Sequence, residues 1–359
     1  MTVTTSVSTT VPARLTRLGV LMTPEPGEAN EAEGVLNPGS GRDADGRLWL
    51  LPRLVAAGNF SRVGLAEVVV ENGIPVGVRR DGVALAPDAG WERGLEYGGV
   101  EDPRTTWVSD LAVHVMTYVA YGPLGPHPAL ATSTDLRHWE RHGPLRFDYQ
   151  ADLDTDLNLF PNKDCVFFPE PVTAPDGRPA YAMLHRPMWD LSWIRPGEGT
   201  YLPAGIEDDR PGIWISYVPV EDVVRGGVGN LAHLQQHRLV AMSEYEFEAL
   251  KIGAGPPPIR VEQGWLLIHH GVTGSPAQGW ELQQDVRYTA GAMLLDADDP
   301  STVLARSATP LLEPQTAEET SGTVPNVVFP TAIEEIDGVL FVFYGMADSA
   351  IGVARLDLA

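Results

Sequence analysis

The chain consists mainly of short apolar runs separated by polar turns. WLLIHH (265–270) and VLFVFYG (339–345) are typical, and a glycine-containing turn precedes each of them. Runs of this length, bounded by hairpin-type turns, indicate antiparallel β-strands rather than helices. The longest helix candidate, SEYEFEAL (243–250), covers only eight residues. The pattern therefore predicts an all-β fold.

The apolar runs recur in sets along the chain. Five segments begin with a polar–proline step, continue as a predicted first strand and lead into a turn: 36–46, 101–110, 168–177, 256–264 and 329–338. Second strands are predicted at 47–53, 113–121, 180–186, 265–270 and 339–345, and third strands at 62–68, 128–134, 212–218, 290–296 and 350–356. Fourth strands are predicted at 76–87, 138–147, 234–243 and 303–314, and residues 14–24 resemble the fourth strand that the last set lacks.

Five repeats of four strands predict a five-bladed β-propeller whose last blade is closed by the N-terminal strand. Closing the ring in this way leaves only short, protected sheet edges. The alternative is a β-sandwich with accidental periodicity, but sandwiches seldom reach this length. We expect residues 1–13 to form a flexible tail and residues 14–359 to form one propeller domain.

Charged residues gather where the predicted first strands begin. In a propeller these strands line the central channel, so their beginnings meet at one of its mouths. Asp102, in EDPR (101–104), is placed there, together with Asn37, Glu170, Lys251 and the residues around Asn326. The ends of second strands add Arg53, Arg186 and His270.

Composition narrows the class of partner. The 359 residues contain 25 Lys and Arg against 48 Asp and Glu, for a net charge of −23, which argues against general affinity for nucleic acid or anionic membranes. Cys165 is the single cysteine, so no disulfide can form within the chain and a reducing compartment fits. The start of the sequence does not resemble a signal peptide, and no apolar run could span a membrane. These features predict a cytoplasmic protein, with no metal or organic cofactor expected.

A basic cluster stands out against this acidic background. The predicted mouth gathers Arg53, Lys163, Arg186, Lys251 and His270. Each alone has a structural explanation, and a satisfied, half-buried histidine is the simpler reading of His270 taken by itself. Together, however, buried cations repel one another unless an anion fills the site. Phosphate is the obvious candidate, and the imidazolium of His270 is expected to add charge at low pH.

Seven motifs in order resemble glycoside hydrolase family 130, which holds β-mannoside phosphorylases and some β-1,2-mannosidases built as five-bladed propellers. They are EDPR (101–104), NKDCVFFPE (162–170), LHRP (184–187), KIGAGPPPI (251–259), GWLLIHHG (264–271), NVVFP (326–330) and YGMADS (344–349). The resemblance implies that Asp102 is the general acid and that Lys163, Arg186, Lys251 and His270 bind phosphate. It also implies that Asn37, Arg53 and Asp348 bind the sugar, and that the proton is relayed through a sugar hydroxyl.

Two departures from the family pattern concern the substrate. Lys163 stands where the phosphorylases usually have arginine, so the charge is kept but the planar, two-pronged contact is lost. A long stretch, 187–211, carries Trp189, Trp193 and Tyr201, which suggest a loop over the acceptor sugar. The linkage and the acceptor therefore stay open.

The sequence thus predicts an inverting β-mannoside phosphorylase, a glycosyltransferase-type enzyme that uses phosphate as co-substrate to release α-mannose 1-phosphate from a mannose-containing disaccharide or oligosaccharide. The first alternative is a β-1,2-mannoside hydrolase, in which Glu170 or a carboxylate from 207–209 would activate water. The second is a sugar-binding propeller without catalysis, although a lectin needs neither Asp102 nor an anion cluster. Whether the protein forms a homo-oligomer is left open.

Overall fold

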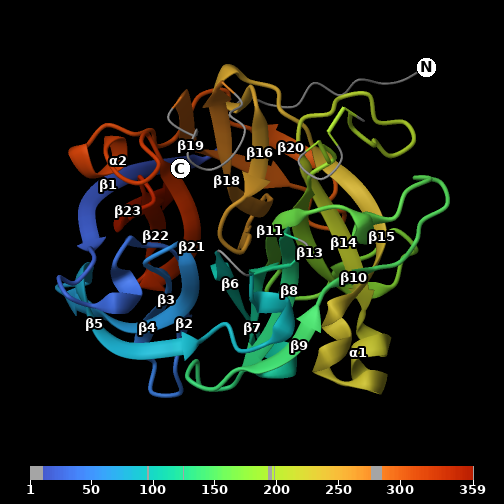
Figure 1. The fold of residues 1–359 in the computed structure, drawn as a ribbon. Coiled ribbons are helices and arrows are strands. Elements are labelled where there is room, and N and C mark those ends of the chain that lie inside the picture. Colours follow the sequence, from blue (N-terminus) through green and yellow to red (C-terminus); the bar gives the residue numbers. More distant parts are fainter. Residues whose placement is uncertain are drawn as a thin grey trace.

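The computed structural model describes residues 11–94, 97–123, 125–192, 196–197, 199–275 and 285–358. The predicted tail, residues 1–13, lies outside this part except for residues 11–13. The fold is all-β, as predicted, and Figure 1 shows the sheets arranged around the middle of the molecule. The α-helices among the described residues are α1 (Val220–Gly226), which the sequence did not predict, and α2 (Ala317–Thr320), and the other helical segments are short 3-10 turns. Neither has the length and apolar character needed to span a membrane.

The largest sheet has eight strands and contains the first two predicted sets. A parallel contact of two residue pairs, Phe60 with Gly98 and Ser61 with Gly99, joins the two sets through β4 and β6. The strands are β2 (Gly34–Arg42), β3 (Leu48–Ala56), β4 (Phe60–Glu71), β5 (Ile74–Leu85), β6 (Gly98–Val108), β7 (Val113–Gly122), β8 (Gly125–Ser133) and β9 (Glu140–Pro144).

The next two sheets contain the third and fourth sets. The first consists of β10 (Arg146–Phe147), β11 (Asn162–Phe167), β12 (Val172–Thr173), β13 (Pro179–Pro187), β14 (Ile213–Pro219) and β15 (His233–Ala241). The second consists of β16 (Lys251–Ala254), β17 (Ile259–Val261), β18 (Gly264–Gly274), β19 (Val286–Leu295) and β20 (Val303–Arg306). A buried apolar cluster contains residues of both sheets, including Val166, Leu184, Ile252 and Leu267.

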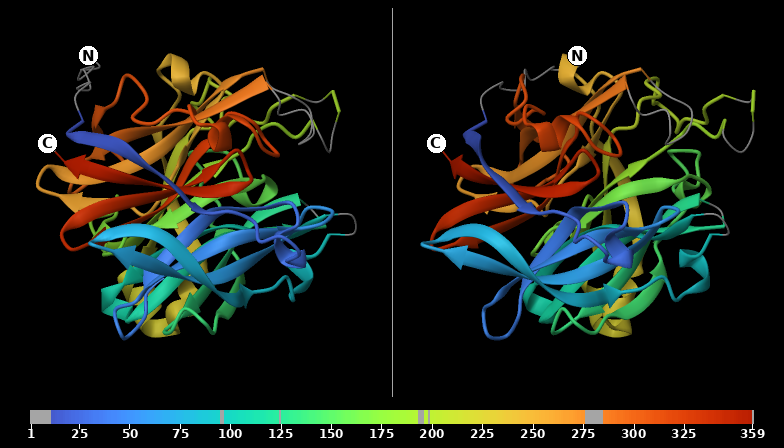
Figure 2. Two further views of the ribbon diagram at one scale, coloured as in Figure 1. Left: turned by 90° about the vertical axis from the view of Figure 1, so that its left-hand side faces the viewer. Right: turned by 60° about the vertical axis from the view of Figure 1, so that its left-hand side comes forward.

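The fourth sheet brings the two ends of the chain together. It consists of β21 (Val328–Ile336), β22 (Val339–Met346), β23 (Ala350–Leu358) and β1 (Ala13–Met22). β1 is antiparallel to β23, from Ala13 opposite Leu358 to Met22 opposite Ile351, and Figure 2 shows the dark-blue strand beside the red ones. The predicted pairing of residues 14–24 with the last strand is confirmed.

Two predicted first strands are wrong. In the third set the inner strand is β11, before the predicted 168–177, and in the fourth it is β16, before 256–264. Proline has no N–H to donate to a ladder, so the proline-rich segments after these strands hold only the short β12 and β17. The fourth strands at 138–147 and 303–314 are also shorter than predicted, since β9 ends at Pro144, Arg146–Phe147 joins the next sheet and β20 ends at Arg306.

Three inner strands share a backbone irregularity. Their registers shift between Leu36 and Gly39 in β2, Glu101 and Arg104 in β6, and Lys163 and Val166 in β11. Within these bulges, Asn37, Asp102 and Asp164 have φ angles of 43°, 48° and 55°. This left-handed conformation is unfavourable for residues other than glycine, and it re-aims the side chain at the bulge. Three polar side chains are therefore redirected at equivalent points of neighbouring sets.

Buried glutamates tie outer strands to the turns that precede inner strands. Each lies at a short helical turn and pairs with an arginine on the last strand of its set, at 2.7–2.8 Å: Glu31 with Arg80, Glu92 with Arg141, Glu248 with Arg306 and Glu319 with Arg17. The last pair spans the two ends of the chain, because Arg17 lies on β1. These contacts tie the last strand of each of these sets to the turn before an inner strand.

Candidate active site

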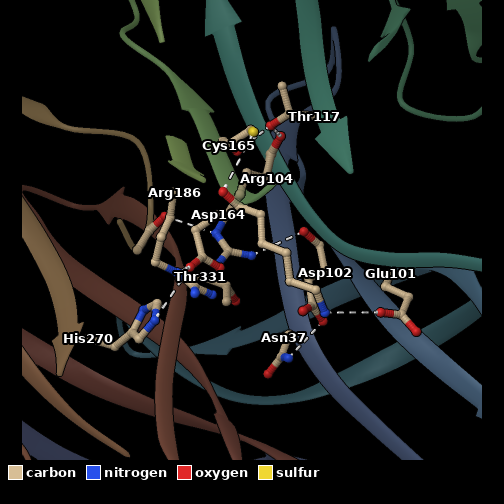
Figure 3. Close-up of polar contacts among 12 residues, drawn as sticks. Asn37, Glu101, Asp102, Arg104, Thr117, Asp164, Cys165, Arg186, His270 and Thr331 are labelled. Atoms are coloured by element: carbon tan, nitrogen blue, oxygen red, sulfur yellow. Dashed lines mark hydrogen bonds and ion pairs between the residues drawn. The ribbon is translucent and has the colours of Figure 1, made fainter. Parts of the chain in front are cut away.

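Asp102 is held by groups from the preceding set of strands. Its Oδ1 accepts a hydrogen bond from Asn37 Nδ2 over 2.8 Å and pairs with Arg53 Nη1 at 3.1 Å (Figure 3 shows the Asn37 contact). Arg53 also contacts Glu101 Oε1 through Nη2, at 2.9 Å. Three of the residues predicted for the site, Asn37, Arg53 and Asp102, are thus brought into direct contact.

The Asp102 carboxyl is ionised in the free protein. Burial acts to raise its pKa, but Arg53, Lys163 and Arg104, together with the hydrogen bond from Asn37, hold the pKa below its usual value. A general acid has to carry a proton when the bond breaks. A carboxyl in this state could act as a general acid only after it gains a proton.

Asp348 is a second carboxyl within reach of the same charges. It follows β22 and has a φ of 49°. Burial raises the pKa of Asp348 to about 6, with Asp102 and Glu101 adding to the rise and Arg53 opposing it. A carboxyl of this kind is partly protonated near neutral pH and can donate as well as accept a hydrogen bond. That property suits contact with sugar hydroxyls.

The four predicted anion ligands lie on two neighbouring sheets. Lys163 and Arg186 come from β11 and β13, where they are directly opposite each other in the register, and Lys251 and His270 come from β16 and β18. Lys163 is partly exposed, with Nζ 3.8 Å from Glu101 Oε2, and Lys251 Nζ lies 5.4 Å from the centre of the Tyr288 ring. Arg186 and His270 are buried. The tertiary structure therefore gathers these four residues, as predicted.

The buried cluster already contains a carboxylate, which the sequence reasoning missed. Asp164 Oδ2 lies 2.6 Å from Arg186 Nε and 3.5 Å from His270 Nε2. Burial acts to raise the pKa of Asp164, but Arg186, His270 and Arg104 hold it far below its usual value. The premise that only an external anion could balance these cations is therefore wrong.

Two of the predicted phosphate ligands, Lys251 and His270, have lowered pKa values, which changes the charge that they carry. Burial lowers the pKa of Lys251 to about 7, helped by Arg186 and Lys163 and opposed by Asp164. Burial also lowers the pKa of His270 well below its usual value, Asp164 opposing and Arg186, Arg104 and Lys251 adding to the effect. His270 is consequently neutral, and the expected imidazolium charge at low pH is wrong for the free protein.

Arg104 connects the two halves of the site. Its guanidinium is buried, donating from Nε to Gly255 O over 3.0 Å and from Nη1 to Asp102 O over 3.1 Å, while Nη2 lies 3.6 Å from Asp164 Oδ1 (Figure 3). Both Arg104 and Asp164 sit inside motifs that the sequence reasoning singled out, EDPR and NKDC, next to residues that it did name. Arg104 lies within the predicted first strand 101–110, where a charged residue was the available signal, whereas Asp164 lay outside every predicted strand.

The carboxylates suggested as hydrolytic bases are poorly situated. Glu170 is exposed and lies beyond the end of β11, six residues past Asp164, or about 20 Å along an extended chain. Its predicted place at the channel mouth is therefore wrong. Glu207 and Asp209 are exposed, and Asp208 is paired with Arg210.

The aromatic loop predicted over the acceptor is only partly available. Trp189 is buried, with its ring centre 5.1 Å from that of Phe160 and 5.7 Å from that of Trp214, so it belongs to the apolar core. Trp193 lies outside the described residues. Tyr201 is exposed and remains a candidate for contact with an acceptor.

Comparison with known proteins points to one family. The glycoside hydrolase family 130 model, described as β-1,4-mannooligosaccharide phosphorylase, matches residues 59–359. Two proteins of Thermoanaerobacter sp. (strain X514) are 32% identical: a 1,2-β-oligomannan phosphorylase, over 73% of this chain and 70% of its own, and a β-1,2-mannobiose phosphorylase, over 73% and 68%. The solved β-1,2-mannobiose phosphorylase of Listeria innocua, in complex with β-1,2-mannobiose, superposes with a TM-score of 0.69 over 96% of both chains at 22% identity.

Proposed function

This chain belongs to glycoside hydrolase family 130, and we propose that it is an inverting β-mannoside phosphorylase that releases α-mannose 1-phosphate. The observation that carries the proposal is that a carboxylate site and a cationic site lie on the two sides of Arg104. On one side Asp102 is a half-buried carboxylate held by Asn37 and Arg53. On the other, Arg186, Lys251 and Lys163 form a cationic group. An acid opposite an anion site is what cleavage by phosphate requires.

The proposed reaction balances without a further proton donor. An oxygen of HPO₄²⁻ attacks the anomeric carbon from the face opposite the leaving group, the glycosidic C–O bond breaks, and the leaving oxygen takes a proton delivered by Asp102. In the ternary complex the proton of HPO₄²⁻ passes to Asp102 and from there to the leaving oxygen, so that mannose 1-phosphate forms as a dianion and Asp102 ends ionised, as it began. Because Asp102 is ionised in the free protein, this proton has to reach it in the ternary complex.

The residues around Asp102 would hold the mannosyl unit. Asn37 and Arg53 donate hydrogen bonds in this region, and Asp348 offers a carboxyl with a pKa of about 6, raised by burial. The four residues Lys163, Arg186, Lys251 and His270 would bind phosphate, His270 as a neutral donor. We further propose that the five sets of strands close into one five-bladed ring, so that inner-strand bulges converge on a common channel.

The linkage requires a direct test. The matching family model is described by a β-1,4 activity, whereas the relatives above are described by β-1,2 activities. Purified protein should be incubated with β-1,2- and β-1,4-mannobiose, with and without inorganic phosphate, and the products identified by NMR. Phosphate-dependent release of α-mannose 1-phosphate is expected. Free mannose formed without phosphate would replace the proposal by a hydrolase, and binding without turnover would replace it by a sugar-binding protein.

A further inference from the structure

Asp164 lies where basic side chains from three sheets converge. Its Oδ2 is 2.6 Å from Arg186 Nε on β13 and 3.5 Å from His270 Nε2 on β18, and its Oδ1 is 3.6 Å from Arg104 Nη2 on β6. Figure 3 shows Asp164 between these three groups. The side chain is only 3% exposed. Asp164 has no part in the proposed chemistry, yet no other described residue contacts basic side chains from so many sheets, two arginines and the neutral His270.

The backbone and a neighbouring glycine make this position possible. Asp164 lies in the bulge of β11 with a φ of 55°, which turns its side chain out of the ordinary strand alternation. On the facing strand β16, a Cβ at Gly253 would overlap Asp164 Oδ2 and come within 2.5 Å of His270 Cε1. The contact between Asp164 and His270 therefore requires glycine at position 253.

The groups around Asp164 have hydrogen-bonding atoms to spare, of which neutral His270 supplies one donor and one acceptor. Arg186 Nη1, Arg104 Nη2 and both ring nitrogens of His270 are buried and have no hydrogen-bond partner within the described part of the chain. Leaving a buried polar group unsatisfied is unfavourable. Asp164 thus engages one edge of the Arg186 guanidinium and leaves the other edge free for a ligand that offers several acceptors. An oxyanion has that character.

We propose that Asp164 is a positioning residue for phosphate, which fixes the Arg186 guanidinium through Nε and balances the charge of the cluster before the anion arrives. This inference rests on the proposed function, because it takes phosphate as the ligand of the cluster. Asp164 acts through Arg186 and His270 and does not touch the reacting atoms. Its negative charge would repel phosphate if it stood alone, so its effect depends on the cations that it orders.

The charge of Asp164 also acts on Lys251. Burial lowers the pKa of Lys251 to about 7, and Asp164 keeps it from falling further. The charged and titratable groups that act on or face Lys251 are Arg186 of β13, Lys163 and Asp164 of β11, His270 of β18 and Tyr288 of β19. Removing the carboxylate charge leaves the cationic groups unopposed, so Lys251 should lose its proton at a lower pH.

The test is Asp164→Asn, which keeps the size of the side chain and removes its charge. Binding of inorganic phosphate should be measured by titration calorimetry from the acidic to the alkaline side of about pH 7, where Lys251 titrates. We expect a loss of affinity of about tenfold or more just below about pH 7, where Lys251 is still charged in the wild type but has lost its proton in the variant, as for one charge-assisted hydrogen bond. The loss should be smaller at more acidic pH, where Lys251 is charged in both proteins, and the pH at which affinity falls should move lower. Asp176→Asn, in an exposed turn of the same sheet, is the matched control and should change neither quantity.

A second variant separates position from charge. Gly253→Ala intrudes on Asp164 and His270 but keeps both, so phosphate affinity should fall while the pH midpoint stays near that of the wild type. A folded Asp164→Asn protein with wild-type affinity and midpoint would overturn the proposal. If Asp164→Asn does not fold, unchanged affinity in Gly253→Ala overturns it instead. Wild-type protein that binds phosphate yet releases free mannose contradicts only the proposed function, whereas wild-type protein that binds no phosphate contradicts both.

Discussion

Asn37 donates a hydrogen bond from Nδ2 to Oδ1 of Asp102 over 2.8 Å, and both residues have left-handed backbone, with φ angles of 43° and 48°. Each lies in the bulge of an inner strand. Such a conformation costs on the order of 1–3 kcal/mol per residue and persists only where the surrounding structure enforces it. The packed sheets therefore hold the Asp102 carboxylate in place before any substrate arrives.

Asp102→Asn should abolish turnover and leave the fold intact. The leaving oxygen loses its proton source, and general acid catalysis is typically worth about 10²–10⁴-fold. The rate should be measured on an unactivated mannobiose, and folding by circular dichroism. Asp110→Asn, an exposed carboxylate in the short turn that follows the same strand, should behave like the wild type. More than about a tenth of wild-type activity in Asp102→Asn would remove Asp102 from the role of acid.

Lys251 should make anion binding depend on pH. Burial lowers its pKa to about 7, so the ammonium is present below that pH and lost above it. Sulfate is a suitable probe, because it does not itself titrate in this range. Competitive inhibition of the wild type by sulfate against phosphate should weaken as the pH rises through about 7. Sulfate should inhibit Lys251→Met only weakly, and to the same extent across this pH range. A wild-type protein with no such step would contradict the assignment of Lys251.

Arg186→Lys should weaken the binding of phosphate specifically. The substitution keeps a cation beside Asp164 but removes the planar guanidinium, which holds Asp164 through Nε and has Nη1 unpartnered among the described residues. A charge-assisted hydrogen bond is worth roughly 1.5–3 kcal/mol, so the KM for phosphate should rise about tenfold or more. The KM for the mannoside should change less. Equal effects on both constants would mean that Arg186 serves the site as a whole.

Deleting residues 1–24 should destabilise the whole protein. It removes β1, which is paired along β23, and with it Arg17, the partner of the buried Glu319. Losing one partner of a buried pair alone costs about 3–5 kcal/mol. At this size each kcal/mol lowers the melting temperature by about 2 °C or less, so the fall should reach several degrees. Removing residues 1–10 only is the control, and a 1–24 deletion that melts like this control would show that β1 is dispensable.

Glu248→Gln should destabilise the protein at neutral pH and less so in acid. Burial acts to raise the pKa of Glu248, but His269 and Arg306 lower it to about 2. A carboxyl with a lowered folded pKa contributes stability above its unfolded pKa of 4.5, and this is lost as the pH falls towards about 2. Denaturant unfolding at neutral pH should show a loss of about 3 kcal/mol. Glu244→Gln, half exposed beside the same Arg306, should lose far less.

The sequence alone was enough to predict the strand sets and most of their order. Alternating apolar runs and glycine-containing turns are local signals, and they correctly predicted strands such as β7, β13, β22 and β23 and the pairing of the N-terminal strand with the last one. The sequence also led to Asp102, Arg53 and the four basic residues, because these lie in recognisable motifs or at the predicted starts and ends of strands.

Tertiary structure decided what these residues do to one another. Asp164 is adjacent to Lys163 in the sequence, yet its partners Arg104, Arg186 and His270 come from three sheets, and neither periodicity nor spacing encodes such contacts. Burial decided that His270 is neutral and that Lys251 titrates near neutrality, because the cost of a charge depends on neighbours from other strands. Proline motifs marked the ends of β11 and β16 rather than their beginnings, since a residue without an N–H interrupts a ladder wherever the chain places it.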